Sequence, residues 1–174
     1  MTSALTVSVV IVSRERPDAL RRCLMAISQM AYHPFEVVVV ADPASCAHMR
    51  GWPQAARVRV VPYDQANISA ARNLGVNEAS GDIIAFVDDD AVPEPTWLTY
   101  LISPFLDARV VAAGGWVRGR NGISWQSRSQ SVDCAGRTKT LEVDPGRATV
   151  FTARPGRAIK TEGTNMAVRR SCLA

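Results

Sequence analysis

The chain has 174 residues, of which 47% are hydrophobic and 21% are charged. This length suits one domain, and the composition is that of a globular protein with a buried core, which excludes disordered, collagen-like and disulfide-scaffold chains. The net charge of +4 suits an anionic small molecule or an acidic surface and is too modest to indicate a nucleic-acid partner.

The cysteines and the N-terminal residues indicate the cellular compartment of the chain. The four cysteines form no CxxC pair and have no histidine at metal-ligand spacing, so we expect free thiols in a reducing compartment. The chain does not begin with the basic region of a signal peptide, and no stretch reaches the apolar length of a membrane span. We therefore expect a cytoplasmic location and no membrane span in this chain.

Predicted strands punctuate the first two thirds of the chain. Residues 5–12 and 35–41 are almost continuously apolar and β-branched, which is typical of strands buried on both faces of a parallel sheet. Shorter strands are predicted at 57–61, 82–87 and 109–117.

Helices are predicted between most of these strands. The helix that starts at Pro17 places its apolar residues on one stripe, and residues 67–79 form a second helix with a face of small side chains. Residues 95–106 form a third, which Pro104 should break or kink; only a turn is predicted between the second and third strands. This alternation predicts an α/β fold with a doubly wound, mainly parallel sheet.

The character of the chain changes after Val117. Residues 116–160 carry nine Lys or Arg and three acidic residues, so this segment has a charge of +6. Its apolar periodicity is weak, and we expect long loops and short strands laid over one edge of the sheet. We divide the single domain into a core at 1–117 and a basic segment at 118–174.

The strongest chemical signal lies at the end of a predicted strand, where Phe86-Val87 is followed by Asp88, Asp89 and Asp90. Ligands of open α/β sheets bind at the carboxyl ends of the strands. Three adjacent carboxylates repel one another, and Mg²⁺ or Mn²⁺ shared with substrate phosphates would relieve that repulsion. The alternative interpretation is a solvated acidic turn.

Other polar residues follow the strands with less specific signals. Asp42 follows the second strand, where it would accept a hydrogen bond from a nucleotide base or simply cap a turn or helix at Pro43. Arg72 by itself reads as part of a solvated helix face. No GxGxxG, Walker A, GxSxG or HExxH motif is present, which argues against a dinucleotide-binding fold.

Taken together, five stretches resemble the amino-terminal part of family 2 glycosyltransferases, inverting enzymes of the GT-A fold. In chain order these stretches are Val7–Val12 with Arg16-Pro17, Phe35–Asp42, Asn67–Gly75, Gly81–Asp90 with Pro95 and Trp97-Leu98, and Gly163–Arg170. The match covers nearly the whole chain.

The resemblance implies a nucleotide-sugar donor, most often a UDP-sugar, and a divalent metal, Mg²⁺ or Mn²⁺. Val12 and Arg16 would line the nucleotide pocket and Asp42 would contact the base. Arg72 would reach towards the ribose or the diphosphate.

The remaining site residues are also implied by position in the family's motifs. Asp88 and Asp89 would face the ribose and the donor sugar, and Asp90 would bind the metal. Gly163 and Asn165 would border the donor sugar and the acceptor, which is an unknown glycan, lipid or small molecule.

The sequence departs from the family pattern in three places. Ala41 replaces an aspartate that is common before Asp42, and Ile68 stands where glycine is frequent. No acidic pair that could supply the general base follows Arg170, and Glu142 and Asp144 precede the last motif, so neither is assigned as the base. We therefore expect a domain that is incomplete at its C-terminus.

Three functions are compatible with these residues. The first is a glycosyltransferase domain that transfers a sugar to an acceptor hydroxyl with inversion and with a metal. The second is a non-catalytic nucleotide-sugar-binding module that lacks the base. The third is a sugar-phosphate nucleotidyltransferase, which the absence of glycine between Leu5 and Gly51 counts against.

Overall fold

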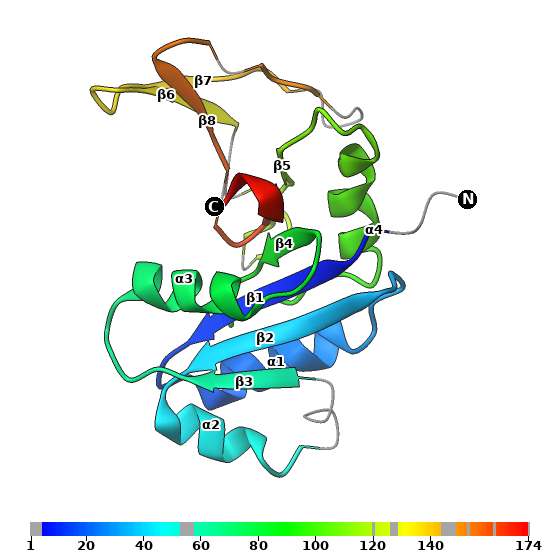
Figure 1. Cartoon of the computed structure of the whole chain (residues 1–174), viewed down its shortest axis with the longest axis vertical. Helices are drawn as coiled ribbons and strands as arrows, with labels where there is room; N and C mark the ends of the chain where they lie inside the picture. Colours follow the sequence, from blue (N-terminus) through cyan, green and yellow to red (C-terminus); the bar gives the residue numbers. More distant parts are fainter. Residues whose placement is uncertain are drawn as a thin grey trace.

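A computed structural model describes residues 5–52, 58–119, 121–125, 129–143, 149–152, 154–161 and 163–173. Its central sheet has the strand order β3-β2-β1-β4-β9-β5 (Figure 1). The strands are β1 Val7–Ser13, β2 Phe35–Ala41, β3 Val58–Pro62, β4 Ile83–Phe86, β5 Ala112–Gly114 and β9 Met166–Arg169. Strands β1 to β4 are parallel to one another, whereas β9 is antiparallel to both β4 and β5. The predicted α/β class with a mainly parallel sheet is confirmed.

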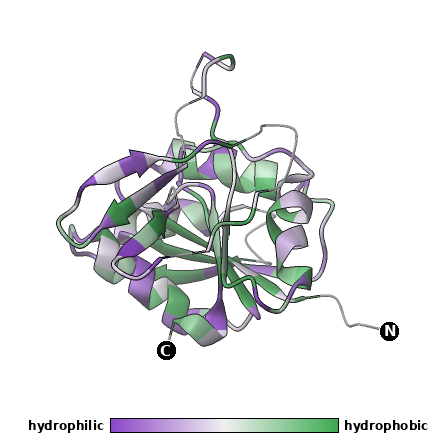
Figure 2. Ribbon diagram, turned by 90° about the horizontal axis from the view of Figure 1, so that it is seen from above, coloured by the Kyte–Doolittle hydropathy of each residue, from purple (hydrophilic) through white to green (hydrophobic). Residues whose placement is uncertain are grey.

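Helices cover both faces of this sheet. The helices are α1 Pro17–Ile27, α2 Pro43–Met49, α3 Ile68–Glu78 and α4 Trp97–Ile102, followed by the 3₁₀ turns η2 Ser103–Leu106 and η3 Arg170–Cys172. Helices α1, α2 and α4 pack with one buried cluster, and α3 packs with the other. Figure 2 shows the hydrophobic strands between these layers. The predicted break at Pro104 is confirmed, because α4 passes there into η2.

The apolar run of β1 is explained by this double cover. Val9 and Ile11 lie in the cluster on the α1 side, and Val10 lies in the cluster on the α3 side; all three are at most 1% exposed. Side chains of a strand alternate between its two faces. A strand with helices on both faces therefore carries apolar residues on both faces, as the run from Val9 to Val12 does.

Gly75 sets how closely α3 approaches the sheet. A Cβ at this position would lie 2.5 Å from Val10 Cγ1 and 3.3 Å from Val40 Cγ2, well inside the usual carbon–carbon contact distance of about 3.5–4.0 Å. The small-residue face predicted for this helix is thus the face that packs on β1 and β2.

Replacing Gly75 with alanine is expected to lower the free energy of unfolding by about 1–3 kcal/mol, the usual cost of overpacking a core. The gain in helix propensity of about 1 kcal/mol opposes part of this loss. Urea denaturation measures the difference. Gly51→Ala is the matched control, because a Cβ there meets nothing within 4 Å. Equal stabilities of the two variants would contradict the close packing.

Three elements differ from the sequence-based expectation. The predicted turn after the second strand is the helix α2, and the strand expected at 109–117 pairs only over Ala112–Gly114. Strand β9 was not predicted as a strand, and it lies between β4 and β5. The Gly114-Gly115 pair shortens β5, since glycine weakens strands.

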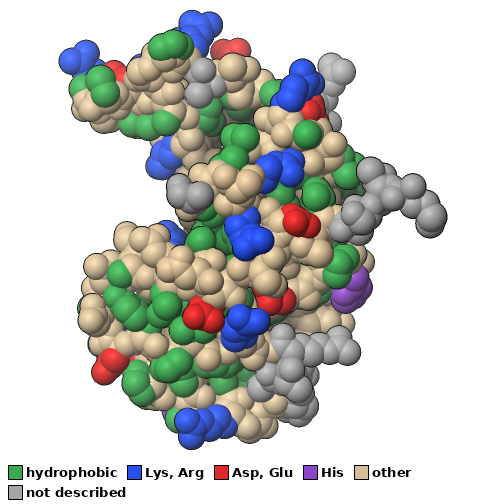
Figure 3. Space-filling model, viewed as in Figure 1, with side chains coloured by type: hydrophobic (Ala, Val, Ile, Leu, Met, Phe, Trp, Pro, Cys, Tyr) green, Lys and Arg blue, Asp and Glu red, His purple; other side chains and the backbone are tan. Residues whose placement is uncertain are grey.

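The basic segment forms a second sheet of short strands, as expected. Its strands are β6 Gln130–Asp133, β7 Thr138–Thr140 and β8 Arg157–Lys160, in the order β7-β6-β8. Figure 3 shows a hollow between this sheet and α3, and Lys and Arg side chains in the upper half of the molecule. The division at residue 117 stays a prediction, and β9 returns the end of the chain to the central sheet.

Two further expectations concern the cysteines and the absence of a membrane span. All four cysteines are free thiols, and burial raises the pKa of Cys23 to about 12. None of the helices in the described part of the chain is long and apolar enough to cross a membrane.

Candidate active site

The carboxyl ends of β1, β2 and β4 bring the predicted polar residues to one edge of the sheet. β1 lies between β2 and β4, and the helix after β1 covers the opposite face from the helix before β4. The crevice between β1 and β4 is therefore the topological switch point, where open α/β sheets bind their ligands.

Asp89 is the buried centre of this edge and is only 4% exposed. One carboxylate oxygen accepts a hydrogen bond of 2.7 Å from the Ser13 hydroxyl at the end of β1, and the other accepts one of 2.7 Å from Arg16 Nη1. A buried carboxylate needs partners of this kind, because leaving it unpaired would be costly. Through these two hydrogen bonds, Asp89 connects the segment after β4 to the end of β1 and the β1–α1 loop.

Arg16 bridges two members of the aspartate triplet. Besides Asp89, its guanidinium contacts Asp90, with 3.3 Å between Nη2 and Oδ2. The charge of Asp89, with the hydrogen bond to it and the charge of Asp90, raises the pKa of Arg16. The Arg16 side chain remains half exposed, so this cation lies where an anionic ligand can reach it.

Asp42 fixes the backbone of the loop that presents Arg16. Its carboxylate accepts four hydrogen bonds: from the N–H groups of Ala44 and Ser45, from the Ser45 hydroxyl, and from the N–H of Glu15 at 2.8 Å. Glu15 has a φ of 57°, a left-handed conformation that is strained for a residue with a Cβ. Asp42 thus caps α2 and holds this strained residue in place.

The cap accounts for all the acceptor positions of the Asp42 carboxylate, which number about four. This arrangement favours the capping interpretation of Asp42 weighed from the sequence, and contact with a nucleotide base stays a prediction. Burial alone would raise the pKa of Asp42, but the hydrogen bonds from Ser45, Glu15 and Ala44 lower it to about 2.

An Asp42→Asn variant tests this cap through its pH dependence. The native pKa of about 2 lies below the unfolded value of about 3.9, so the ionised carboxylate stabilises the fold above pH 4, by about 2–3 kcal/mol. This contribution is lost as the pH falls from 4 towards 2. Urea denaturation should show a stability gap between the two proteins that is full at pH 6 and narrows below pH 4. A gap independent of pH would contradict the cap.

Arg72 and Asp88 form the second ion pair of the edge. Arg72 Nη2 lies 3.1 Å from Asp88 Oδ1, and α3 holds Arg72 in this position. A Cβ on Gly163 would come within 3.0 Å of the Arg72 guanidinium, and the Thr164 hydroxyl accepts a bond of 3.4 Å from the Asp88 N–H. The 163–165 segment therefore lies directly against this pair.

Asn165 is held by two tryptophan residues. Its Nδ2 donates to the Trp116 carbonyl at 2.9 Å, and its Oδ1 accepts from the Trp97 indole N–H at 2.9 Å. A Cβ on Gly115 would meet its amide at 2.5 Å. Asn165 thus positions the 163–165 segment between α4 and the chain after β5.

The acidic triplet suits a divalent cation that also contacts phosphate. The side chains of Asp88 and Asp90 are 44% and 38% exposed, so both present oxygen atoms, the ligands that Mg²⁺ and Mn²⁺ prefer. Within the described residues no group of three or more metal-ligating side chains is arranged to hold an ion. Asp88 and Asp90 together are the kind of donor set with which proteins bind Mg²⁺ in company with substrate phosphates.

The structure brings most of the predicted site residues together. Val12 packs at the edge of the α3-side cluster, next to Ser13. Arg118, the first residue of the basic segment, lies over the ring of Trp125, and Asp144 is outside the described residues. The roles of Ser13 and Thr164 were missed, although Ser13 follows the first strand and Thr164 lies within the Gly163–Arg170 motif.

Comparison with known proteins identifies the family. The sequence model of glycosyl transferase family 2 matches residues 8–173. Glycosyltransferase AglE of Haloferax volcanii is 32% identical over 127 residues, which are 66% of this chain and 40% of AglE. The O-antigen biosynthesis protein RfbC of Myxococcus xanthus is 30% identical over 114 residues, which are 62% of this chain and 9% of RfbC.

Solved structures show the same fold. The mannosyltransferase PcManGT of Pyrobaculum calidifontis, in complex with GDP-Man and Mn²⁺, matches with a TM-score of 0.70 and 19% identity, over 99% of this chain and 46% of that one. S. aureus TarS 1–349 in complex with UDP-GlcNAc matches with a TM-score of 0.66 and 15% identity, over 97% and 46%.

These matches confirm a GT-A α/β fold. The chain belongs to glycosyl transferase family 2. It spans less than half the length of each of these four proteins.

Proposed function

We propose that this chain binds a nucleotide-diphosphate sugar, with a UDP-sugar as the leading candidate. The bound donor would serve an inverting, metal-dependent glycosyl transfer to an acceptor hydroxyl. The observation that carries the proposal is the cluster at the β1–β4 switch point, where Arg16 and Arg72 each pair with members of the aspartate triplet. Two partly exposed guanidinium groups beside three carboxylates can bind a diphosphate and its cation together.

The charges of the cluster explain how the diphosphate would be held. Arg16 and Arg72 offer planar forks of N–H donors that match phosphate oxygens. Asp90, with Asp88 beside it, would hold Mg²⁺ or Mn²⁺, which neutralises charge on the leaving diphosphate when it is bound. Asp89 stays behind these groups and keeps Arg16 oriented.

The placement of the 163–165 segment supports a role next to the transferred sugar. Gly163 lies against Arg72 and Thr164 against Asp88, so a donor sugar attached to a diphosphate at the cluster would meet this segment. For inversion, the acceptor hydroxyl attacks the anomeric carbon opposite the diphosphate. Its proton must pass to a base within hydrogen-bond reach.

Calorimetric titration with UDP and GDP, with and without Mn²⁺, tests donor binding. We expect binding of UDP that requires Mn²⁺, with weaker binding of GDP. A metal-independent interaction, or no interaction, would refute the proposal. Release of UDP from UDP-sugars in the presence of acceptors then separates a transferase from a binding module. The formation of a nucleotide-sugar from UTP and a sugar phosphate would instead identify a nucleotidyltransferase.

A further inference from the structure

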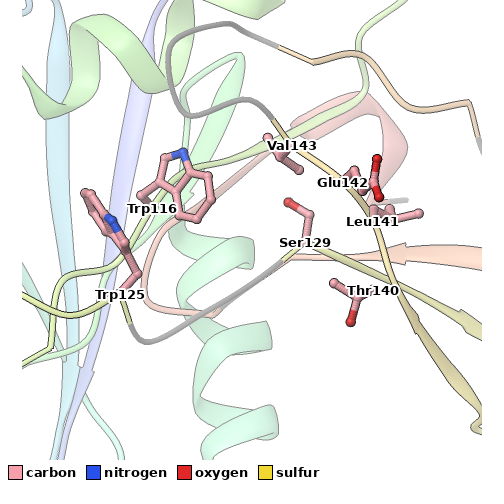
Figure 4. Close-up of a pocket in the computed structure, with 7 residues that line it drawn as sticks. All are labelled: Trp116, Trp125, Ser129, Thr140, Leu141, Glu142 and Val143. Atoms are coloured by element: carbon pink, nitrogen blue, oxygen red, sulfur yellow. The ribbon is translucent and has the colours of Figure 1, made fainter.

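A cavity of about 380 Å³ lies between Trp116, at the end of the core, and the first part of the basic segment, and the aspartate triplet does not line it. It is lined by Trp116, Trp125, Ser129, Thr140, Leu141, Glu142 and Val143. Figure 4 shows the two indole rings on one side and the hydroxyl and carboxylate side chains on the other. Its volume is in the range of small-ligand pockets.

The aromatic wall of this cavity is built from a tryptophan pair. The rings of Trp116 and Trp125 have centroids 5.3 Å apart and are tilted by 53°. Trp125 nevertheless remains 48% exposed. An indole ring offers a broad face with a negative charge distribution, against which the weakly positive C–H groups of a pyranose ring can stack.

The opposite wall supplies hydrogen-bonding groups suited to hydroxyls. Ser129 and Thr140 carry hydroxyls that donate and accept, and Glu142 carries an exposed carboxylate that accepts strongly. Arg118 lies 5.4 Å from the Trp125 ring centroid, and its positive charge disfavours a cationic occupant. The combination of an aromatic face and hydroxyl-binding groups fits a neutral saccharide.

The cavity is connected to the candidate donor site through one short segment. Asn165 donates to the carbonyl of Trp116, while its neighbours Thr164 and Gly163 contact Asp88 and Arg72. A sugar bound at Trp116 would therefore lie beside residues 163–165, the segment that the sugar of a donor at the cluster would also meet. The two sugars must be adjacent for the acceptor hydroxyl to reach the anomeric carbon.

We propose that this tryptophan cavity binds the acceptor and that the acceptor is a saccharide. This proposal rests on the proposed function and adds the chemical class of its acceptor. Trp116 and Trp125 stack on the apolar face of a sugar ring, and Glu142 accepts hydrogen bonds from its hydroxyls. A nucleobase stacked on the same indoles is the competing occupant, and the test separates the two.

The indole N–H signals of the ¹⁵N-labelled chain provide the test, because the protein has only four tryptophans. The probes are methyl glycosides of glucose, galactose, mannose, rhamnose and N-acetylglucosamine, added with UDP and Mn²⁺ present. We expect at least one glycoside to shift the signals of Trp116 and Trp125. The signal of Trp52 should not move, because Trp52 packs under Arg21 and does not line the cavity.

Variants assign the interaction to individual side chains. Trp125→Ala and Glu142→Gln should each weaken glycoside binding by about tenfold, the expected loss for a stacking or charged hydrogen-bond partner. Trp125→Phe should retain much of the affinity, because it keeps an aromatic face. Ile123→Ala is the matched control, since Ile123 is 85% exposed and does not line the cavity.

The outcomes distinguish this proposal from the proposed function. No shift of Trp116 and Trp125 with any glycoside up to its solubility, or a shift caused by UDP alone, would overturn the acceptor site. If UDP still binds with Mn²⁺ in calorimetry, the proposed function stands without it. If a glycoside shifts both signals but no nucleotide binds, the saccharide site stands and the donor proposal fails.

Discussion

Replacing Asp90 with asparagine is expected to abolish most of the Mn²⁺-dependent binding of UDP. The affinity should fall at least about tenfold, because mutation even of a residue that only supports a metal ligand costs that much. Asparagine keeps the size of the side chain and its contact with the solvent, but removes the negative charge that a divalent cation requires. Calorimetric titration of UDP at saturating Mn²⁺ measures the loss.

The matched control is Asp107→Asn, which removes a carboxylate of a surface ion pair with Arg109, outside the strand-end cluster. That variant should bind UDP like the unmodified chain. If Asp90→Asn retains metal-dependent binding, the metal ligand must be another carboxylate. Asp88 is the next candidate, because its side chain is also partly exposed. A loss of folding, monitored by circular dichroism, is not expected at a side chain that is 38% exposed.

The architecture of the central sheet could be predicted because its signals are local. The apolar run of β1 requires cover on both faces, and the break at Pro104 follows from the geometry of proline. The order of the sheet's far edge could not be read in this way. Strand β9 has only four residues, and it exists because it pairs with β4 and β5, which are more than 50 residues away in sequence.

The helix α2 shows a different limit of sequence analysis. Its seven residues are too few to display a helical stripe, and Pro43 is equally common in turns. What decides the outcome is the Asp42 carboxylate, which accepts from the N–H groups of Ala44 and Ser45. The same side chain is the one for which sequence reasoning left a binding role and a capping role open.

The sequence predicted which residues lie at the candidate site, but it did not predict which of them pair with one another. The position after a strand placed Arg16 and the aspartates at one edge. It did not reveal that Asp89 turns inward to Ser13 and Arg16, while Asp88 and Asp90 remain partly exposed. Burial separates three neighbouring carboxylates into one that organises the protein and two that can reach a ligand.

Arg72 provides the second large effect, because it is the cation that lies between Asp88 and the 163–165 segment. Arg72→Gln is expected to weaken UDP binding about ten- to a hundredfold, since a hydrogen bond to a charged group contributes about 1.5–3 kcal/mol. Thermal stability should change little, because a partly exposed ion pair contributes at most about 1 kcal/mol.

A comparison of two further variants separates charge from shape at this position. Arg72→Lys keeps the positive charge but loses the planar fork, so its UDP affinity should fall between those of the unmodified chain and Arg72→Gln. Arg21→Gln is the matched control, because Arg21 lies on α1 over Trp52, outside the cluster. In Arg72→Gln the freed Asp88 carboxylate should also bind Mn²⁺ more tightly in the absence of nucleotide, since a neighbouring cation no longer opposes the metal. Weaker UDP binding together with tighter Mn²⁺ binding would mark Arg72 as a diphosphate ligand, whereas parallel losses of both would mark it as a structural support for Asp88.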